Sequence, residues 1–304
     1  MLGETFYWVF NMSITASVTG ILVMLIGLIK KIPKRMGVFL WVIPFLRMTL
    51  PFGFNSPYSL MAFLSKFTTK TVPVFQSPSG HIFSTTNFIM AADAYFPIAY
   101  KVRSLETVFT VAAFLWLTVF LAIVLTMGMI YFTTLHEIKD AFHLRDNIYL
   151  SDKISSPAVF GIRKPRIILP VSYADRDIAL VLLHEQTHIH KADNLWRVVG
   201  FLAAAAHWFN PLSWLFLSRF LGDLELSCDE CVLLRIGSNR IKEYAASLLD
   251  AKQGTTIFAS SFGGAKIRMR IENILSFKRL TWFSATAFVV LIGVMGYVLL
   301  TNAG

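Results

Sequence analysis

The sequence predicts an α-helical integral membrane protein with four transmembrane helices and one water-facing, mostly helical domain that carries a small β-sheet. The chain of 304 residues is 55% hydrophobic and only 15% charged, a composition outside the range of ordinary soluble domains. Several uncharged runs approach or exceed the length that a helix needs to cross a bilayer, about 20 residues. A single long polar region, about 134–280, is the part able to fold in water.

The basic residues indicate the orientation of these spans. The net charge is +10, and the basic residues flank apolar runs. They are Lys30, Lys31, Lys34 and Arg35 after the first run, and Lys266, Arg268, Arg270, Lys278 and Arg279 before the last. Because cytoplasmic loops carry the excess of Lys and Arg, we expect a multi-pass protein of the cell membrane with both termini extracellular and the 134–280 domain cytoplasmic. A basic face suited to nucleic acid is not predicted.

Three spans are expected in region 1–133, at about 6–29, 37–53 and 108–132. The first is followed by its basic cluster, the reverse of a secretory signal, so it is predicted to be an uncleaved anchor. The second is interrupted by Arg47 and Pro51, and we expect Arg47 to face other helices or to snorkel. Residues 54–104 are predicted to form an extracellular loop, whereas the third span contains no charge.

The 134–280 region predicts short strands followed by helices. The strands are expected at 148–150, 158–160 and 166–169, where β-branched and aromatic residues lie between turn residues. A helix is predicted from about Tyr173, with Asp175 and Asp177 in its first turns. Further helices are expected at 194–207, 211–236 and 240–252, a loop at 254–266, and a fourth span at 282–300 within the last segment, 281–304.

The chemistry is expected in the segment His184-Glu185-Gln186-Thr187-His188. Two histidines four residues apart lie on one face of a helix, so both imidazoles can reach one metal ion. Glu185 lies where its carboxylate could hold a water on that ion. Two surface histidines that happen to lie near a glutamate are the alternative.

A zinc hydrolase needs a third protein ligand and an open position for water. The candidates downstream are Asp193, His207, Asp223, Glu225, Asp229 and Glu230. Glu225 and Asp229 share a helix face, so a Glu225 ligand would let Asp229 reach back to a zinc-bound histidine. The alternative is that 222–230 is a solvated acidic face, and the spacing alone does not select Glu225. His207 is expected to pack or to make an interfacial hydrogen bond, with an oxyanion donor at the active site as the alternative. Cys228 and Cys231 are expected to be buried structural residues, with a zinc pair as the alternative.

The apolar segment 198–217 is long enough for a fifth span, but a shared metal argues against it. A span between His188 and Glu225 would separate these ligands by about 30 Å, whereas each must lie about 2 Å from one ion. Asn210 and Pro211 supply a break midway. We therefore predict a membrane-associated re-entrant segment at 198–217, in which a helix, a break and a second helix lie at or dip into the cytoplasmic leaflet.

The chain resembles the BlaR/MecR-type membrane zinc metallopeptidases, the antirepressor sensor–transducers of β-lactam resistance. Several motifs in the same order carry this resemblance over nearly the whole chain. They are Phe160-Gly161 with Pro165-Arg166 to Pro170, His184-Glu185-x-x-His188 with Lys191-x-Asp193, His207-Trp208-Phe209-Asn210-Pro211, Glu225-Leu226-Ser227-Cys228-Asp229, and Arg270-Ile271-x-x-Ile274-Leu275.

The resemblance implies a gluzincin-type metallopeptidase domain. His184, His188 and Glu225 would be the Zn²⁺ ligands, Glu185 the general base, and Asp229 a partner of a zinc-bound histidine. It also implies hydrolysis of a cytoplasmic protein, a transcriptional repressor, in antibiotic or envelope-stress signalling. The sensor members carry a penicillin-binding domain after the fourth span, and we expect this chain to lack it. The expected partners are that substrate, the lipid bilayer and, as an option, a second copy of the chain.

Two other functions are compatible with the sequence. One is a membrane quality-control or processing protease, which would have the same metal site but different substrates. The other is a receptor-like signalling scaffold in which the metal is inert or structural. A transporter is disfavoured, because the polar residues cluster outside the predicted spans.

Overall fold

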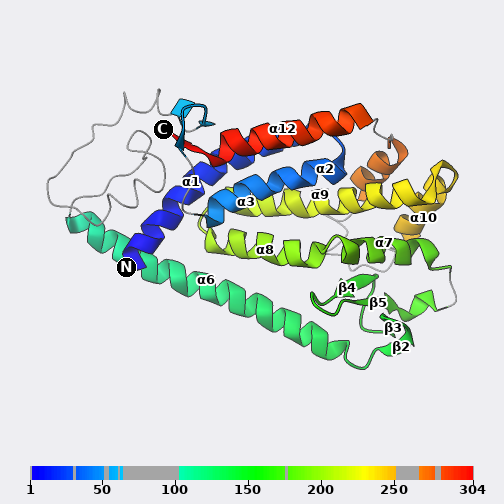
Figure 1. Cartoon of the computed structure of the whole chain (residues 1–304). Coiled ribbons are helices and arrows are strands. Elements are labelled where there is room, and N and C mark those ends of the chain that lie inside the picture. Colours follow the sequence, from blue (N-terminus) through cyan, green and yellow to red (C-terminus); the bar gives the residue numbers. More distant parts are fainter. Residues whose placement is uncertain are drawn as a thin grey trace.

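The structure, a computed structural model, describes residues 2–29, 32–50, 55–60, 62–63, 103–174, 177–250, 267–277 and 282–303. Most of this part is helical. Its long helices lie side by side, and a small sheet lies at one end, next to helix α7 (Figure 1). Both termini lie at the opposite end (Figure 1). The described residues are therefore mostly helical with a small mixed sheet, as the sequence predicts.

The long apolar helices agree with the first and third predicted spans. They are α1 (Leu2–Gly27) and α6 (Arg103–Glu137). Within the described residues, Thr5–Gly27 and Thr107–Glu137 are long and apolar enough to cross a membrane, by length and composition, and Ser284–Leu300 of α12 (Trp282–Leu300) is a shorter apolar helix. The predicted loop at 54–104 lies almost entirely outside the described residues.

The second predicted span is a broken helix. It consists of α2 (Lys34–Gly37), a 3₁₀ helix (Val38–Trp41) and α3 (Val42–Thr49), followed by β1 (Asn55–Ser56), which pairs in parallel with β6 (Asn302–Ala303). Arg47 is buried and donates hydrogen bonds to the carbonyls of Leu299 and Thr301, at 2.9 and 2.6 Å. Carbonyls at a helix C-terminus lack partners within the helix, so Arg47 faces another helix, as expected.

The sheet has four strands in the order β2-β3-β5-β4. Three match the prediction: β3 (Ile148–Ser151), β4 (Ala158–Phe160) and β5 (Arg166–Pro170). Strand β2 (Phe142–Arg145) is not among the predicted strands; it has only four residues, and all of them are exposed. It pairs with β3 through a tight turn in which Asp146 has a positive φ of 47°. β4 is therefore an edge strand, and it lies beside α7.

Helix α7 (Ala179–His190) carries the two histidines and begins later than predicted. The segment Val171–Tyr173 forms a separate 3₁₀ turn instead of starting the helix. Asp177 lies before α7, and its Oδ1 accepts a hydrogen bond from the N–H of Ala179 at 3.0 Å. A carboxylate in this position satisfies one of the N–H groups that the first helical turn leaves free. Asp175 lies outside the described residues.

The segment expected to fold back forms a helical hairpin. Helices α8 (Asp193–Ala206) and α9 (Pro211–Ile236) are in contact and are joined by a turn at 207–210, the predicted break (Figure 1). The other helices of the domain, α10 (Ile241–Asp250) and the short helical stretch 267–275, lie near the far end of α9 (Figure 1). His188 and Glu225 are thereby brought to the same end of the hairpin.

The turn of the hairpin is bonded to three surrounding helices. Asn210 Nδ2 donates to the hydroxyls of Ser13 and Ser17 on α1, both at 2.8 Å, while its Oδ1 accepts from the N–H of Leu212 at 3.0 Å. His207 Nε2 lies 2.9 Å from the Met48 carbonyl of α3. In addition, the Trp116 indole of α6 donates to the Ala206 carbonyl at 2.7 Å. The turn therefore lies midway along α1, among the apolar helices.

The substitution N210A removes both the cap of α9 and the bonds to α1. We expect the free energy of unfolding in detergent to fall by about 1–3 kcal/mol, since a cap and an interhelical polar contact each contribute about 1 kcal/mol. Chemical denaturation followed by circular dichroism measures the change. N239A, in an exposed 3₁₀ turn outside the hairpin, is the control, and equal midpoints for the two variants would contradict this role.

Candidate metal centre

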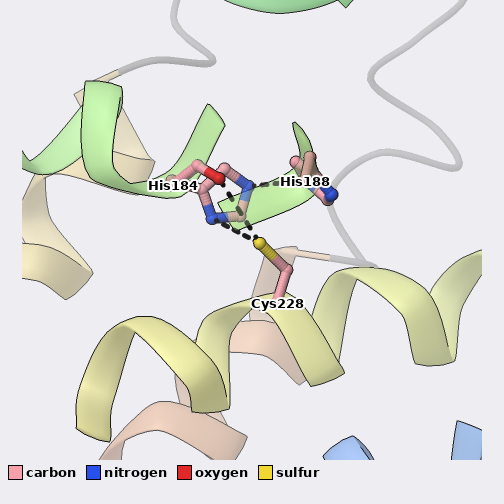
Figure 2. A group of neighbouring side chains, drawn as sticks. All are labelled: His184, His188 and Cys228. Carbon is pink, nitrogen blue, oxygen red and sulfur yellow. Dashed lines mark hydrogen bonds between the residues drawn. The ribbon is translucent and has the colours of Figure 1, made fainter. Parts of the chain in front are cut away.

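Helix α7 places the two predicted histidine ligands against each other. His184 and His188 are both buried, and their Nε2 atoms lie 3.1 Å apart (Figure 2). Residues four apart on a helix face the same side, so this approach follows from the local geometry of α7. Other groups bond the two Nδ1 atoms, so the two Nε2 atoms are the candidate donors to one ion, and Arg270 Nη2 lies 3.3 Å from the Nε2 of His184.

Helix α9 places a carboxylate near the two Nε2 atoms. Oε2 of Glu225 lies 3.8 Å from His184 Nε2, and its Oε1 lies 3.7 Å from His188 Nε2. Ligand atoms about 2.0–2.1 Å from a tetrahedral zinc ion are about 3.3–3.4 Å apart. The three separations bracket that value, so the donor set of two imidazoles and one carboxylate fits a zinc ion.

Cys228 offers a second candidate set, because one donor atom each from His184, His188 and Cys228 lie within 4.8 Å of one another. Its sulfur, however, contacts the other side of the His184 ring: Sγ is 3.5 Å from Nδ1 and 3.5 Å from the backbone oxygen of His184 (Figure 2). Glu225 instead faces both Nε2 atoms. We therefore favour Glu225, and Cys228 packs beneath His184, fully buried as expected.

Each histidine is oriented by a hydrogen bond at Nδ1. His188 Nδ1 donates to Asp193 Oδ2 at 2.6 Å. His184 Nδ1 donates to the Tyr244 hydroxyl at 2.8 Å, and that hydroxyl donates to Asp229 Oδ1 at 2.7 Å. Bonds of this kind fix the tautomer that leaves Nε2 free for a metal. Asp229 itself lies 3.5 Å from His184 Nδ1, so it reaches the histidine mainly through Tyr244.

Two arginines face the carboxylates of the site. Arg197 of α8 donates to Glu225 Oε1 at 2.6 Å. Arg270, in the helical stretch 267–275, donates from Nε and Nη2 to the two oxygens of Asp229, at 2.8 and 2.7 Å. Neither arginine, nor Tyr244, was predicted at the site. No spacing pattern in the sequence links these three residues to the two histidines, although Arg270 belongs to one of the motifs noted above.

The electrostatics of the cluster favour a bound cation. Burial opposes charge on the imidazoles, but the neighbouring Cys228 and Glu225 outweigh it and raise the pKa of His184 to about 10. Burial is also the largest effect on His188, but its interactions with Asp193, Cys228 and Glu225 together outweigh burial and raise its pKa well above the usual value. Conversely, the two histidines and Arg270 hold the pKa of Glu225 well below its usual range despite burial. Without an ion, protons provide the positive charge that these groups attract.

A cavity of about 190 Å³ opens onto the histidines. Its lining includes His184, His188 and Glu225, the side chain of Glu185, and residues 156–159 in and before the edge strand β4. Glu185 is buried, and within the described part of the chain no hydrogen bond to its carboxylate is found. The predicted general base therefore faces the same space as the metal donors.

The remaining candidate ligands lie elsewhere. His207 contacts the Met48 carbonyl at the hairpin turn. The Asp223 carboxylate accepts from the Trp41 indole at 2.9 Å. Glu230 accepts the backbone N–H groups of Lys34 and Arg35, at 2.9 and 3.0 Å. These three contacts are structural and take the side chains away from the two histidines.

The sequence is similar to a protein family and to several known proteins. The family model described as BlaR1 peptidase M56 matches residues 7–274. The chain is similar to "Regulatory protein BlaR1" of Bacillus licheniformis, 30% identical over 155 residues that cover 47% of this chain and 26% of that protein. It is also similar to "Regulatory protein BlaR1" of Staphylococcus aureus, 29% identical over 135 residues (41% and 23%). For "Methicillin resistance mecR1 protein" of Staphylococcus epidermidis the identity is 29% over 106 residues (34% and 18%). The match thus spans about a quarter or less of these relatives.

Substitutions of Glu225 and of Cys228 test which of the two residues is the third zinc ligand. We expect E225Q to weaken zinc affinity by about 100-fold or more, because loss of a ligand should exceed the 10–100-fold effect of an outer contact. C228A should leave the affinity nearly unchanged. Competition with a chelator, followed by metal analysis of the purified protein, measures both. A strong loss in C228A with none in E225Q would assign the site to the cysteine.

Proposed function

This chain belongs to the BlaR1 peptidase M56 family, and we propose that it is a membrane-embedded zinc metallopeptidase that hydrolyses peptide bonds in a cytoplasmic protein. The observation that carries the proposal is one shared cavity. His184, His188, Glu225 and Glu185 all line it. This is the set of groups that hydrolysis by zinc requires: three ligands and one base.

Each group has a distinct task in the proposed reaction. Zinc, when bound, would acidify the attacking water and polarise the scissile carbonyl. Glu185 would take a proton from that water and pass it to the leaving amine. Asp193 holds His188, and the pair of Tyr244 and Asp229 holds His184, so that the ligand nitrogens keep their direction.

The edge strand β4 supports a peptide as substrate. Residues 156–159 line the cavity, and an edge strand presents backbone groups to which an extended peptide can pair. The Asn194 side chain donates to the carbonyls of Val159 and Gly161, at 2.9 and 3.1 Å, and holds the end of this strand. A substrate backbone aligned along 156–159 would lie next to Glu185 and the two histidines.

The proposed topology has four spans, with both termini outside and the peptidase domain in the cytoplasm. It rests on the two long apolar helices, the shorter α12 and the basic clusters beside them. The substrate we propose is a transcriptional repressor, cleaved in antibiotic or envelope-stress signalling. Its support is similarity to proteins called "Regulatory protein BlaR1" and "Methicillin resistance mecR1 protein".

Glu185 also separates this proposal from a signalling scaffold with a structural metal. In the described residues no hydrogen bond to the Glu185 carboxylate is found, and the residue lines the cavity. A scaffold with a structural metal does not need a carboxylate there, whereas a hydrolase needs one as its base. A quality-control protease would share every feature of the site and differs only in its substrates.

We expect E185Q to retain zinc while proteolysis falls by about 10²–10⁴-fold, the contribution of a positioned base. Proteins that change size in cells with the wild-type chain, and are trapped by E185Q, identify the substrates. E272Q, at an exposed site, is the matched control. A repressor among the trapped proteins supports a role in signalling, whereas a broad set of misfolded membrane proteins supports quality control. Full proteolysis by E185Q would exclude the proposed mechanism.

A further inference from the structure

Arg270 connects the segment before the fourth predicted span to the metal centre. It lies in the helical stretch 267–275, yet its side chain is only 13% exposed and reaches into the cavity beside the histidines. Its guanidinium forms a fork on Asp229, with Nε to Oδ2 at 2.8 Å and Nη2 to Oδ1 at 2.7 Å. Nη1 lies 3.3 Å from Glu225 Oε2 as well. Bidentate pairs of this kind fix direction as well as distance.

The fork is the outer end of a continuous set of hydrogen bonds. Arg270 holds Asp229, Asp229 accepts the hydroxyl of Tyr244, and that hydroxyl accepts the Nδ1 proton of His184. Asp229 is fully buried, so its charge depends on the guanidinium for compensation. If Arg270 were withdrawn, Asp229 would lose its partner and the position of the Tyr244 hydroxyl would no longer be fixed.

The same segment is fastened to the domain by a buried apolar residue. Ile274, one turn after Arg270, is fully buried in a cluster with Leu180 of α7, Val232 of α9 and Tyr244 of α10. The neighbouring Leu275 is 61% exposed. The helical stretch 267–275 therefore packs against α7, α9 and α10, three of the helices that form the site, and its position sets how far Arg270 extends.

We propose that Arg270 is a positioning residue that orients His184 through Asp229 and Tyr244, so that the seating of residues 267–275 controls how tightly the site holds zinc. The proposal rests on the proposed function only in taking zinc as the bound ion. It places the control in the segment that precedes α12 in the sequence.

The charge of Arg270 must be separated from its geometry. Its Nη2 lies 3.3 Å from His184 Nε2, the nitrogen expected to bind zinc, and a positive charge there repels a cation. R270K keeps the charge but removes the planar fork, and with it both the bidentate hold on Asp229 and the contact with Glu225. Y244F separates these two effects, because it leaves the contact between Arg270 and Glu225 in place. We expect zinc affinity to fall by about 10–100-fold, the usual cost of losing an outer contact of a metal ligand.

Chelator competition on the purified full chain measures this affinity without any substrate. Y244F should weaken zinc in the same way, because it breaks the same set of bonds. R268K is the matched control, since the Arg268 side chain is 82% exposed and pairs with Glu272. If R270K and Y244F bind zinc as tightly as the wild type, Arg270 does not position His184 and the proposal is wrong.

A second comparison tests the seating of the segment. I274A should weaken zinc while L275A should not, and the melting temperature of the metal-free variants shows whether both fold. Reciprocally, zinc should slow amide hydrogen exchange in residues 267–275 of the wild type, since coupled sites stabilise each other equally. Exchange that is insensitive to zinc would overturn the coupling, even if I274A failed to fold.

The outcomes distinguish this proposal from the proposed function. If E185Q loses proteolysis as expected but R270K binds zinc as tightly as the wild type, only the role of Arg270 is excluded. Conversely, if R270K and Y244F lower the zinc affinity but E185Q retains full proteolysis, the positioning role holds and the proposed mechanism is excluded.

Discussion

The structure depends on one constraint: His188 and Glu225 must meet although an apolar stretch of membrane-spanning length separates them in sequence. The α8–α9 hairpin meets it by turning back at 207–210, where Asn210 and His207 bond to α1 and α3. Because the hairpin packs between the other apolar helices, its return leg brings Glu225 and Asp229 to the end where α7 lies. The metal centre and the helical body are therefore parts of one packing arrangement.

Helix α9 serves both parts at once. One side presents Glu225 and Asp229 to the histidines, while Asp223 and Glu230 bond to Trp41 and to the start of α2. Glu230 in particular accepts N–H groups that the first turn of α2 cannot satisfy itself. A shift of the apolar helices against each other would therefore also move Glu225. This is a physical basis for coupling across the fold.

Buried charge is compensated closely around the site. Three carboxylates, Asp193, Glu225 and Asp229, face two histidines and the guanidinium groups of Arg197 and Arg270. Burying such groups unpaired would cost several kcal/mol each, so removing one member is expected to disturb the others. A bound dication fits this balance because it replaces the protons that the two histidines otherwise attract.

Short-range rules explain what the sequence alone determined. Apolar length predicted the long helices, with the bounds of α12 as predicted. The four-residue spacing of His184 and His188 set their shared face, since helix geometry requires no other element. Two local features also differ from the prediction: the hairpin of β2 and β3, and the cap that Asp177 provides at the start of α7. Long-range packing decided the rest. Tyr244, Arg197 and Arg270 come from separate helices, and the choice between Glu225 and Cys228 depends on which atom faces both Nε2 nitrogens. Such contacts join residues far apart in the chain, so only the tertiary structure could place them.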